Sequence, residues 1–186
     1  MLARITAFSK RKECRLPLLH LALCAIFGAG FGVLFTATVN PSYLLMMRSA
    51  VKAPASIVGL MVVGIAPFLI CLPMVSSGRP LLIYPICLCK VFLYAAGIYA
   101  IHLTFGRAGW LIVFLAQFSD FCLIPALFWF ALRGLIGNKL RLRDILICFG
   151  ISVLVILLDY LVISPFAVQL FDTYETVGRY AISCWI

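Results

Sequence analysis

Apolar residues in this chain gather into long stretches that short polar or basic turns separate. The stretches cover about residues 16–39, 53–75, 80–105, 108–132 and 145–171. Each is long enough for a helix across the bilayer core, which takes about 20 residues. None shows the short alternation of apolar and polar residues that is typical of a transmembrane β-strand. The pattern predicts an all-α, polytopic membrane helix bundle of about five transmembrane helices, in which residues 1–186 form a single integral membrane domain.

Composition excludes a soluble domain. The chain is 65% apolar and only 11% charged, whereas soluble domains are about 45–50% apolar and about 25% charged. The net charge of +9 could indicate nucleic-acid binding, but the basic residues lie at the ends of the apolar stretches. That placement favours topology signals and contact with anionic lipid headgroups. We therefore expect membrane lipids as partners and no nucleic acid.

The basic residues also predict an orientation. With five spans and a cytoplasmic N-terminus, the inside segments contain Arg4, Lys10, Arg11, Lys12, Arg15, Arg79, Arg133, Lys139, Arg141 and Arg143. The outside segments contain only Arg48, Lys52, Arg107 and Arg179. This asymmetry follows the positive-inside rule, and the opposite orientation violates it. We expect the N-terminus inside and the C-terminus outside.

The first stretch is predicted to be an uncleaved membrane helix. It follows a basic segment, as a signal peptide would, but it is longer than an ordinary signal-peptide core. Gly28 and Gly32 within it form a GxxxG pair, which permits close approach of a second helix. Glycine is common in membrane helices in any case, so a packing face and a coincidence of composition both remain open.

Three ionisable residues, Lys90, Asp120 and Asp159, lie near the middle of apolar stretches. A charge at the bilayer centre costs about 2.5–3.5 kcal/mol on insertion scales, so such residues usually face partners inside a bundle. Lys90 precedes the turn near 105–106 by about fifteen residues and Asp120 follows it by about fourteen, which places them at nearly equal depth. A similar count about the basic loop at 133–143 places Asp159 level with Asp120. Gln117, one helical turn before Asp120, could add a hydrogen bond on the same face.

These positions predict an intramembrane charge cluster of Lys90, Asp120, Asp159 and Gln117. Lys90 pairs with Asp120 in one arrangement and is shared between Asp120 and Asp159 in the other. One cation facing two carboxylates leaves one of them partly compensated, and that carboxylate could be protonated. The cluster could lock the bundle or dock a partner, or it could relay protons or ions.

We find no sequence support for catalysis, a cofactor or a metal site. The eight cysteines contain no CxxC pair, and most lie inside apolar stretches, where cysteine behaves as a small hydrophobic residue. They are Cys14, Cys24, Cys71, Cys87, Cys89, Cys122, Cys148 and Cys184. His102 and His20 are far apart in sequence. No nucleophile elbow, phosphate-binding loop or HExxH motif occurs.

The third and fourth stretches resemble the stage II sporulation protein M family. The resemblance is carried by Gly78-Arg79-Pro80, by Phe105-Gly106-Arg107-Ala108-Gly109-Trp110-Leu111, by Phe114-Leu115-Ala116-Gln117-Phe118-Ser119-Asp120 and by Ile124-Pro125-Ala126-Leu127. The polar segment reads Gln117-Phe118-Ser119-Asp120 where the family pattern has a Gln-Asn-like pair, so no family role is carried over to Asp120.

The resemblance implies a non-enzymatic integral membrane scaffold in the bacterial plasma membrane. Its complex would remodel septal peptidoglycan during engulfment in sporulation, and its partners would be membrane-anchored cell-wall hydrolases. A small membrane transporter, or the substrate-capture subunit of an uptake system, is the alternative, because such subunits have a similar length. Five spans with an external C-terminus and the lack of a polar substrate pocket in the sequence argue mildly against it.

Overall fold

The computed structural model describes residues 12–39, 42, 56–76, 80–105, 110–136, 142–170 and 172–173. These residues are helical almost throughout, and no strand occurs among them. The principal helices are α2 (Lys12–Thr38), α4 (Ile57–Ser76), η1 (Pro80–Leu82), α5 (Ile83–Phe105), α6 (Trp110–Ala116), α7 (Phe118–Leu135) and α8 (Leu142–Leu158), followed by the π-helical turn η3 (Asp159–Ile163). Five helical segments are long and apolar enough to cross a membrane. The predicted fold class, a membrane helix bundle with five spans, is confirmed.

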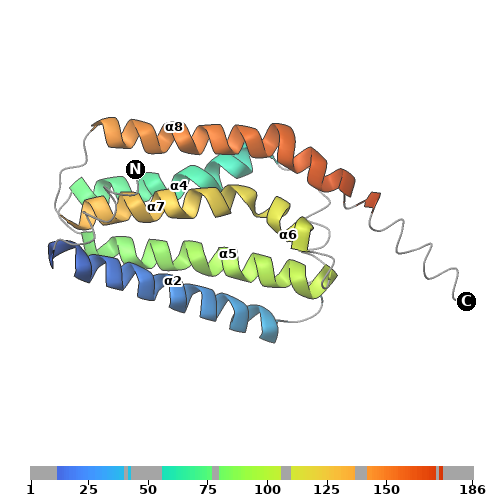
Figure 1. The fold of residues 1–186 in the computed structure, drawn as a ribbon, viewed down its shortest axis with the longest axis horizontal. Helices are drawn as coiled ribbons and strands as arrows, with labels where there is room; N and C mark the ends of the chain where they lie inside the picture. The colour runs from blue at the N-terminus through green and yellow to red at the C-terminus, as the bar shows by residue number, and fades with distance from the viewer. Residues whose placement is uncertain are drawn as a thin grey trace, which may run out of the picture.

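The spans run alternately up and down the bundle (Figure 1). Helix α2 lies at one edge and packs mainly against α5, whereas α4, α7 and α8 pack against one another on the other side of α5. The beginning of α2 and the end of the last span lie at opposite ends of the bundle, as an odd number of spans requires.

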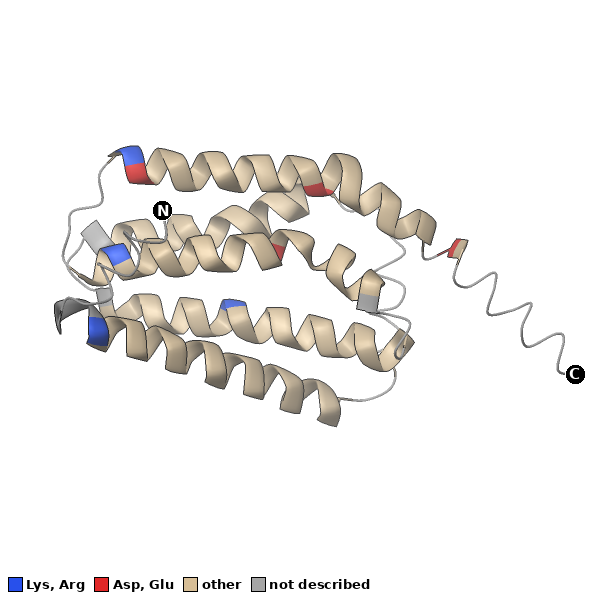
Figure 2. Ribbon diagram, viewed as in Figure 1, with Lys and Arg blue, Asp and Glu red and all other residues tan. Residues whose placement is uncertain are grey.

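Basic residues at the described helix ends gather at one end of the bundle (Figure 2). Arg15 begins the first candidate span, Arg133 lies in the last turn of α7, and Arg143 lies in the first turn of α8. The orientation rule assigns all three to the cytoplasmic side. The orientation itself stays a prediction; a reporter fused to the C-terminus should be active outside the cytoplasm, and a cytoplasmic signal would contradict it.

Two spans differ from the uninterrupted helices that we expected. The fourth span, predicted as 108–132, is divided into α6 and α7 at Gln117, whose backbone has φ −114° and ψ 16°. The fifth span, predicted as 145–171, passes through η3 before it continues as residues 164–170. Single π-turns inside α-helices often mark functional sites. Both irregularities lie beside the charged residues of the bundle interior.

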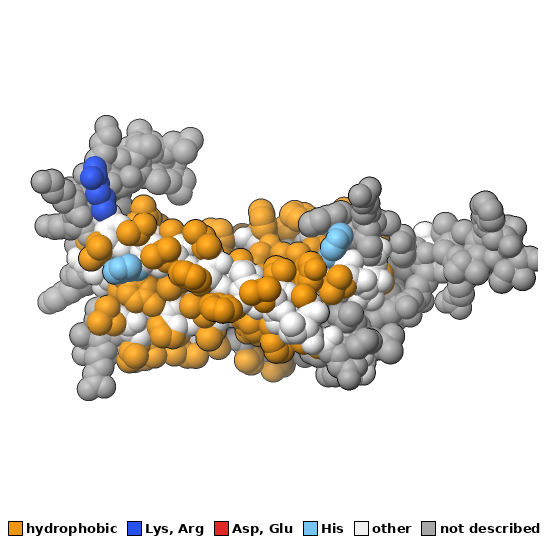
Figure 3. Space-filling model, turned by 90° about the horizontal axis from the view of Figure 1, so that it is seen from below, with side chains coloured by type: hydrophobic (Ala, Val, Ile, Leu, Met, Phe, Trp, Pro, Cys, Tyr) orange, Lys and Arg blue, Asp and Glu red, His pale blue; other side chains and the backbone are white. Residues whose placement is uncertain are grey.

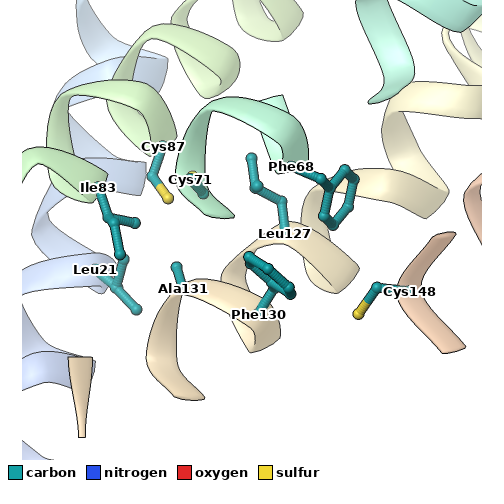
Figure 4. Close-up of a cluster of buried hydrophobic side chains, with 9 residues drawn as sticks. All are labelled: Leu21, Phe68, Cys71, Ile83, Cys87, Leu127, Phe130, Ala131 and Cys148. Carbon is teal, nitrogen blue, oxygen red and sulfur yellow. The ribbon is translucent and has the colours of Figure 1, made fainter. Parts of the chain in front are cut away.

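One apolar cluster receives side chains from all five spans (Figure 4). Its buried members are Leu21, Phe68, Cys71, Ile83, Cys87, Leu127, Phe130, Ala131 and Cys148. A smaller cluster at the other end contains Ile101, Phe105, Ile112 and Val113. The outer surface is apolar as well, as the space-filling view in Figure 3 shows for the face seen from below. This inside and outside pattern fits a bundle that is surrounded by lipid.

Helices α2 and α5 approach each other closely at small residues. A methyl group added at Gly28 would lie 2.8 Å from the carbonyl oxygen of Leu88, and one added at Gly32 would lie 2.5 Å from that of Phe92. One turn further along α2, the buried Thr36 hydroxyl lies 3.3 Å from the carbonyl oxygen of Ala96. The GxxxG pair therefore marks a packing face.

Candidate functional site

Lys90 and Asp120 are in direct contact inside the bundle. The Lys90 Nζ atom lies 2.6 Å from Oδ1 of Asp120, and the two side chains are 6% and 15% exposed. Lys90 comes from the middle of α5 and Asp120 from the first turn of α7. The two residues that the depth count placed level thus form an ion pair that ties α5 to α7.

The second acceptor for Lys90 is a backbone carbonyl oxygen of α4 that a proline leaves without its usual donor. The Lys90 ammonium group donates a hydrogen bond of 3.2 Å to the carbonyl oxygen of Val63. In a regular helix that carbonyl accepts from the N–H group four residues later, but residue 67 is a proline inside α4 and has no N–H. Pro67 therefore leaves the Val63 carbonyl available, and Lys90 occupies it. Through this bond the ammonium group joins α4, α5 and α7.

Asp159 lies beside this pair on a different helix. It is the first residue of η3 and is only 5% exposed. The hydroxyl and the backbone N–H of Ser119 interact with its carboxyl group, and the carboxyl group of Asp120 is its electrostatic neighbour. Because α7 begins at Phe118, the Ser119 N–H belongs to the first helical turn, where backbone donors have no partner within the helix. Asp159 is thus placed at the N-terminus of α7.

Together these groups form a polar layer across the middle of the bundle, which comprises Lys90, Asp120, Asp159, Ser119 and the Val63 carbonyl. Figure 2 shows charged positions near the middle of α5, of the α6–α7 span and of the last span. Apolar clusters lie on both sides of the layer. The layer holds an ammonium group, two carboxyl groups and a helix N-terminus, which can bind or exchange a proton or fix how the helices pack.

Gln117 lies apart from the ion pair. Its side-chain amide packs against α5 at Gly97, where an added methyl group would lie 2.8 Å from Nε2 of Gln117. The expected hydrogen bond on the Asp120 face assumed a continuous helix through both residues. The break at Gln117 removes that relation. Among the described residues, no hydrogen bond joins the Gln117 side chain to Asp120.

Sequence reasoning missed the part of the layer that involves the backbone. The Val63 carbonyl carries no signal of its own, because valine is an ordinary apolar residue. The signal that could have found it is Pro67, four residues later in an apolar helix. Residue spacing gave Ser119 no role, because its position beside Asp159 depends on the helix start at Phe118.

The described cysteines and histidines form no metal centre. The six cysteines whose side chains are described are free thiols, and Cys71, Cys87 and Cys148 belong to the apolar cluster. No group of three or more His, Cys, Asp or Glu residues in the described part of the chain could hold a metal ion. The Nδ1 atom of His20 lies 3.5 Å from the hydroxyl oxygen of Tyr84, and this contact joins α2 to α5.

Comparison with known proteins gives no relative. No family model matches the chain, and neither the curated proteins nor the solved structures contain a match. The class of protein is therefore defined by the fold alone, as a multi-pass helical membrane protein with a charged layer in its interior.

Proposed function

We propose that this chain is a non-enzymatic integral membrane scaffold of the bacterial plasma membrane. The observation that supports it best is the engagement of Lys90 by Asp120 and by the Val63 carbonyl, which ties α4, α5 and α7 together in the bundle interior. Apolar clusters pack on both sides of this tie. A bundle fixed in this way presents constant outer surfaces, which is what docking of other membrane proteins requires.

The biological setting of the proposal comes from the resemblance to the stage II sporulation protein M family. That resemblance covers residues 78–127 most sharply and stands without a matching family model. On this basis the complex remodels septal peptidoglycan during engulfment. Its partners are membrane-anchored hydrolases that resemble the D and P proteins of the same sporulation stage, and this chain supplies their assembly platform.

Deletion and complementation in the source bacterium test the proposal. We expect deletion to arrest sporulation at engulfment, and we expect the tagged chain to co-purify with the hydrolases. The double variant Lys90→Met/Asp120→Leu is the informative complement, because apolar residues of similar volume can replace a buried ion pair without loss of the fold. A scaffold should still complement with this variant. Normal engulfment in the deletion strain would overturn the proposal.

The helix irregularities support a second candidate, a small transporter or a substrate-capture subunit. Transport sites in membrane bundles are commonly built where helices are interrupted near the midplane. Here α7 begins beside Asp120 and η3 begins at Asp159. A transporter would lose activity in the Lys90→Met/Asp120→Leu variant although the protein folds. It would also show ligand-dependent thermal stabilisation, and genes for a pair of ATPases and a coupling protein would be its neighbours.

A further inference from the structure

Asp159 is the carboxyl group of the polar layer whose charge the described contacts leave uncompensated. Its side chain is buried, and its polar neighbour is Ser119, a neutral residue. The ammonium group of Lys90 is engaged by Asp120 and by the Val63 carbonyl. Asp120 is the charged group that acts electrostatically on Asp159, and it carries the same sign.

Within the described ranges, the elements around Asp159 bring no second cation into the layer. Helix α5 contributes Lys90 and Tyr94, and α7 contributes Asp120 and Cys122, of which Tyr94 lies near Asp120 and Cys122 near Asp159. The only titratable residue of α4 is Cys71, which belongs to the apolar cluster. On the last span, Arg143 and Asp144 lie in the first turn of α8, about four turns from Asp159 at 3.6 residues per turn.

The charges of the layer therefore do not balance when both carboxyl groups are ionised. One ammonium group and two carboxylates sum to one negative charge inside an apolar bundle. Two neighbouring carboxyl groups in a medium of low dielectric constant do not both ionise readily, and one of them holds a proton. The direct contact with Lys90 supplies the counter-charge of the Asp120 carboxylate. Asp159 is then the group left to carry the proton.

We propose that the polar layer is an intramembrane proton-binding site in which Asp159 holds the proton and the Lys90–Asp120 ion pair fixes its position. The proton comes from water and bonds to a carboxylate oxygen of Asp159, and the charge of the layer changes from minus one to zero. No other bond changes. Ser119 is the positioning residue, because it is the polar neighbour of the Asp159 carboxyl group at the start of α7. This inference is independent of the scaffold proposal.

Infrared difference spectroscopy of the full chain in lipid nanodiscs tests the site. A protonated carboxyl group gives a C=O stretching band that a carboxylate lacks, and the band shifts in heavy water. We expect this band in the native protein at neutral pH. The band should disappear in Asp159→Asn and persist in the control variant Asp144→Asn. Asp144 is a buried aspartate of the same helical span and lies in the first turn of α8. Ser119→Ala should move the frequency of the band without abolishing it.

Each outcome decides the proposal. Absence of a carboxylic acid band from the native protein at neutral pH overturns it without recourse to any variant. A band that survives in Asp159→Asn but is lost in Asp120→Asn places the proton on the other carboxyl group and also overturns it. If Asp159→Asn does not yield folded protein, the native spectrum and the Ser119→Ala shift decide instead: an unchanged frequency in Ser119→Ala would exclude Asp159 as the bearer of the proton.

Discussion

Helix α5 is held by two neighbours through different physical means. Against α2 it makes a contact without an ion pair, in which Gly28 and Gly32 let the backbones approach and hydrogen bonds come from Thr36 and from the pair of His20 and Tyr84. Against α4 and α7 it makes a charged contact through Lys90. In lipid the burial of apolar surface does not drive helices together, so close packing and polar contacts must do so. The two sides of α5 show these two solutions in one molecule.

The difference lies in what a single substitution leaves behind. Replacement of a small residue in the α2–α5 contact by a larger one adds a side chain between the helices, and the helices can move apart into lipid. Removal of one charge from the polar layer leaves the partner charge uncompensated in the bundle interior, where neither water nor lipid can supply the missing counter-charge. The charged contact should therefore be the more sensitive to single changes and the more tolerant of a matched double change.

Loss of Lys90 alone should give the largest effect. Breaking a buried pair by removal of one partner costs about 3–5 kcal/mol, because a charge stays unpaired. We expect Lys90→Met to lower the free energy of unfolding by about this amount, measured by denaturation in mixed micelles. Lys90→Met/Asp120→Leu should recover most of it. A double variant that is no more stable than the worse single variant would refute the direct ion pair.

Replacement of Gly32 by a larger residue should give the second largest loss of stability. A methyl group there would lie 2.5 Å from the Phe92 carbonyl oxygen and 2.9 Å from the Ala96 nitrogen. Overpacking typically costs about 1–3 kcal/mol, so Gly32→Val should destabilise the protein by that order and loosen α2. Gly30→Val is the matched control, since nothing lies within 4 Å of the added atom. Equal unfolding energies for the two variants would show that α2 is not packed on α5 through this face.

Replacement of Pro67 should have a smaller effect on stability, which should appear as an energetic coupling to Lys90. Pro67→Ala restores an N–H donor to the Val63 carbonyl, so Lys90 must share an acceptor that it now occupies alone among the described contacts. A net hydrogen bond is worth about 0.5–1.5 kcal/mol. We expect a coupling energy of that order between Pro67→Ala and Lys90→Met in a double-mutant cycle. Purely additive effects would exclude a shared role of Pro67 and Lys90.

The smallest effect should come from Thr36. Its hydroxyl is shared between the Gly32 carbonyl oxygen of its own helix at 3.0 Å and the Ala96 carbonyl oxygen across the interface at 3.3 Å. Hydrogen bonds between membrane helices average about 0.6 kcal/mol. Thr36→Val should therefore lower the unfolding free energy by about that amount. Thr38→Val is the control, because the Thr38 hydroxyl bonds only to carbonyl oxygens of its own helix, those of Leu34 and Phe35. A larger loss in Thr38→Val would contradict the assignment.

The fold could be predicted from the sequence because hydropathy and length alone decide which segments can cross a bilayer. Depth along a helix is also additive, which is why a residue count placed Lys90 opposite Asp120. The break at Gln117 could not be predicted in this way, since no proline or glycine stands at that position. Without the break, neither the contact of Gln117 with Gly97 nor the place of Asp159 at a helix start follows from residue spacing.

The acceptor that Pro67 provides for Lys90 has a consequence for variation at these positions. Because the acceptor is a backbone oxygen, no side-chain substitution at residue 63 deletes it, and any apolar residue there serves Lys90 equally well. The contact is instead encoded four residues away, at a proline that Lys90 does not need to touch. A scan of apolar substitutions would therefore record this interaction as an effect at position 67 and no effect at position 63.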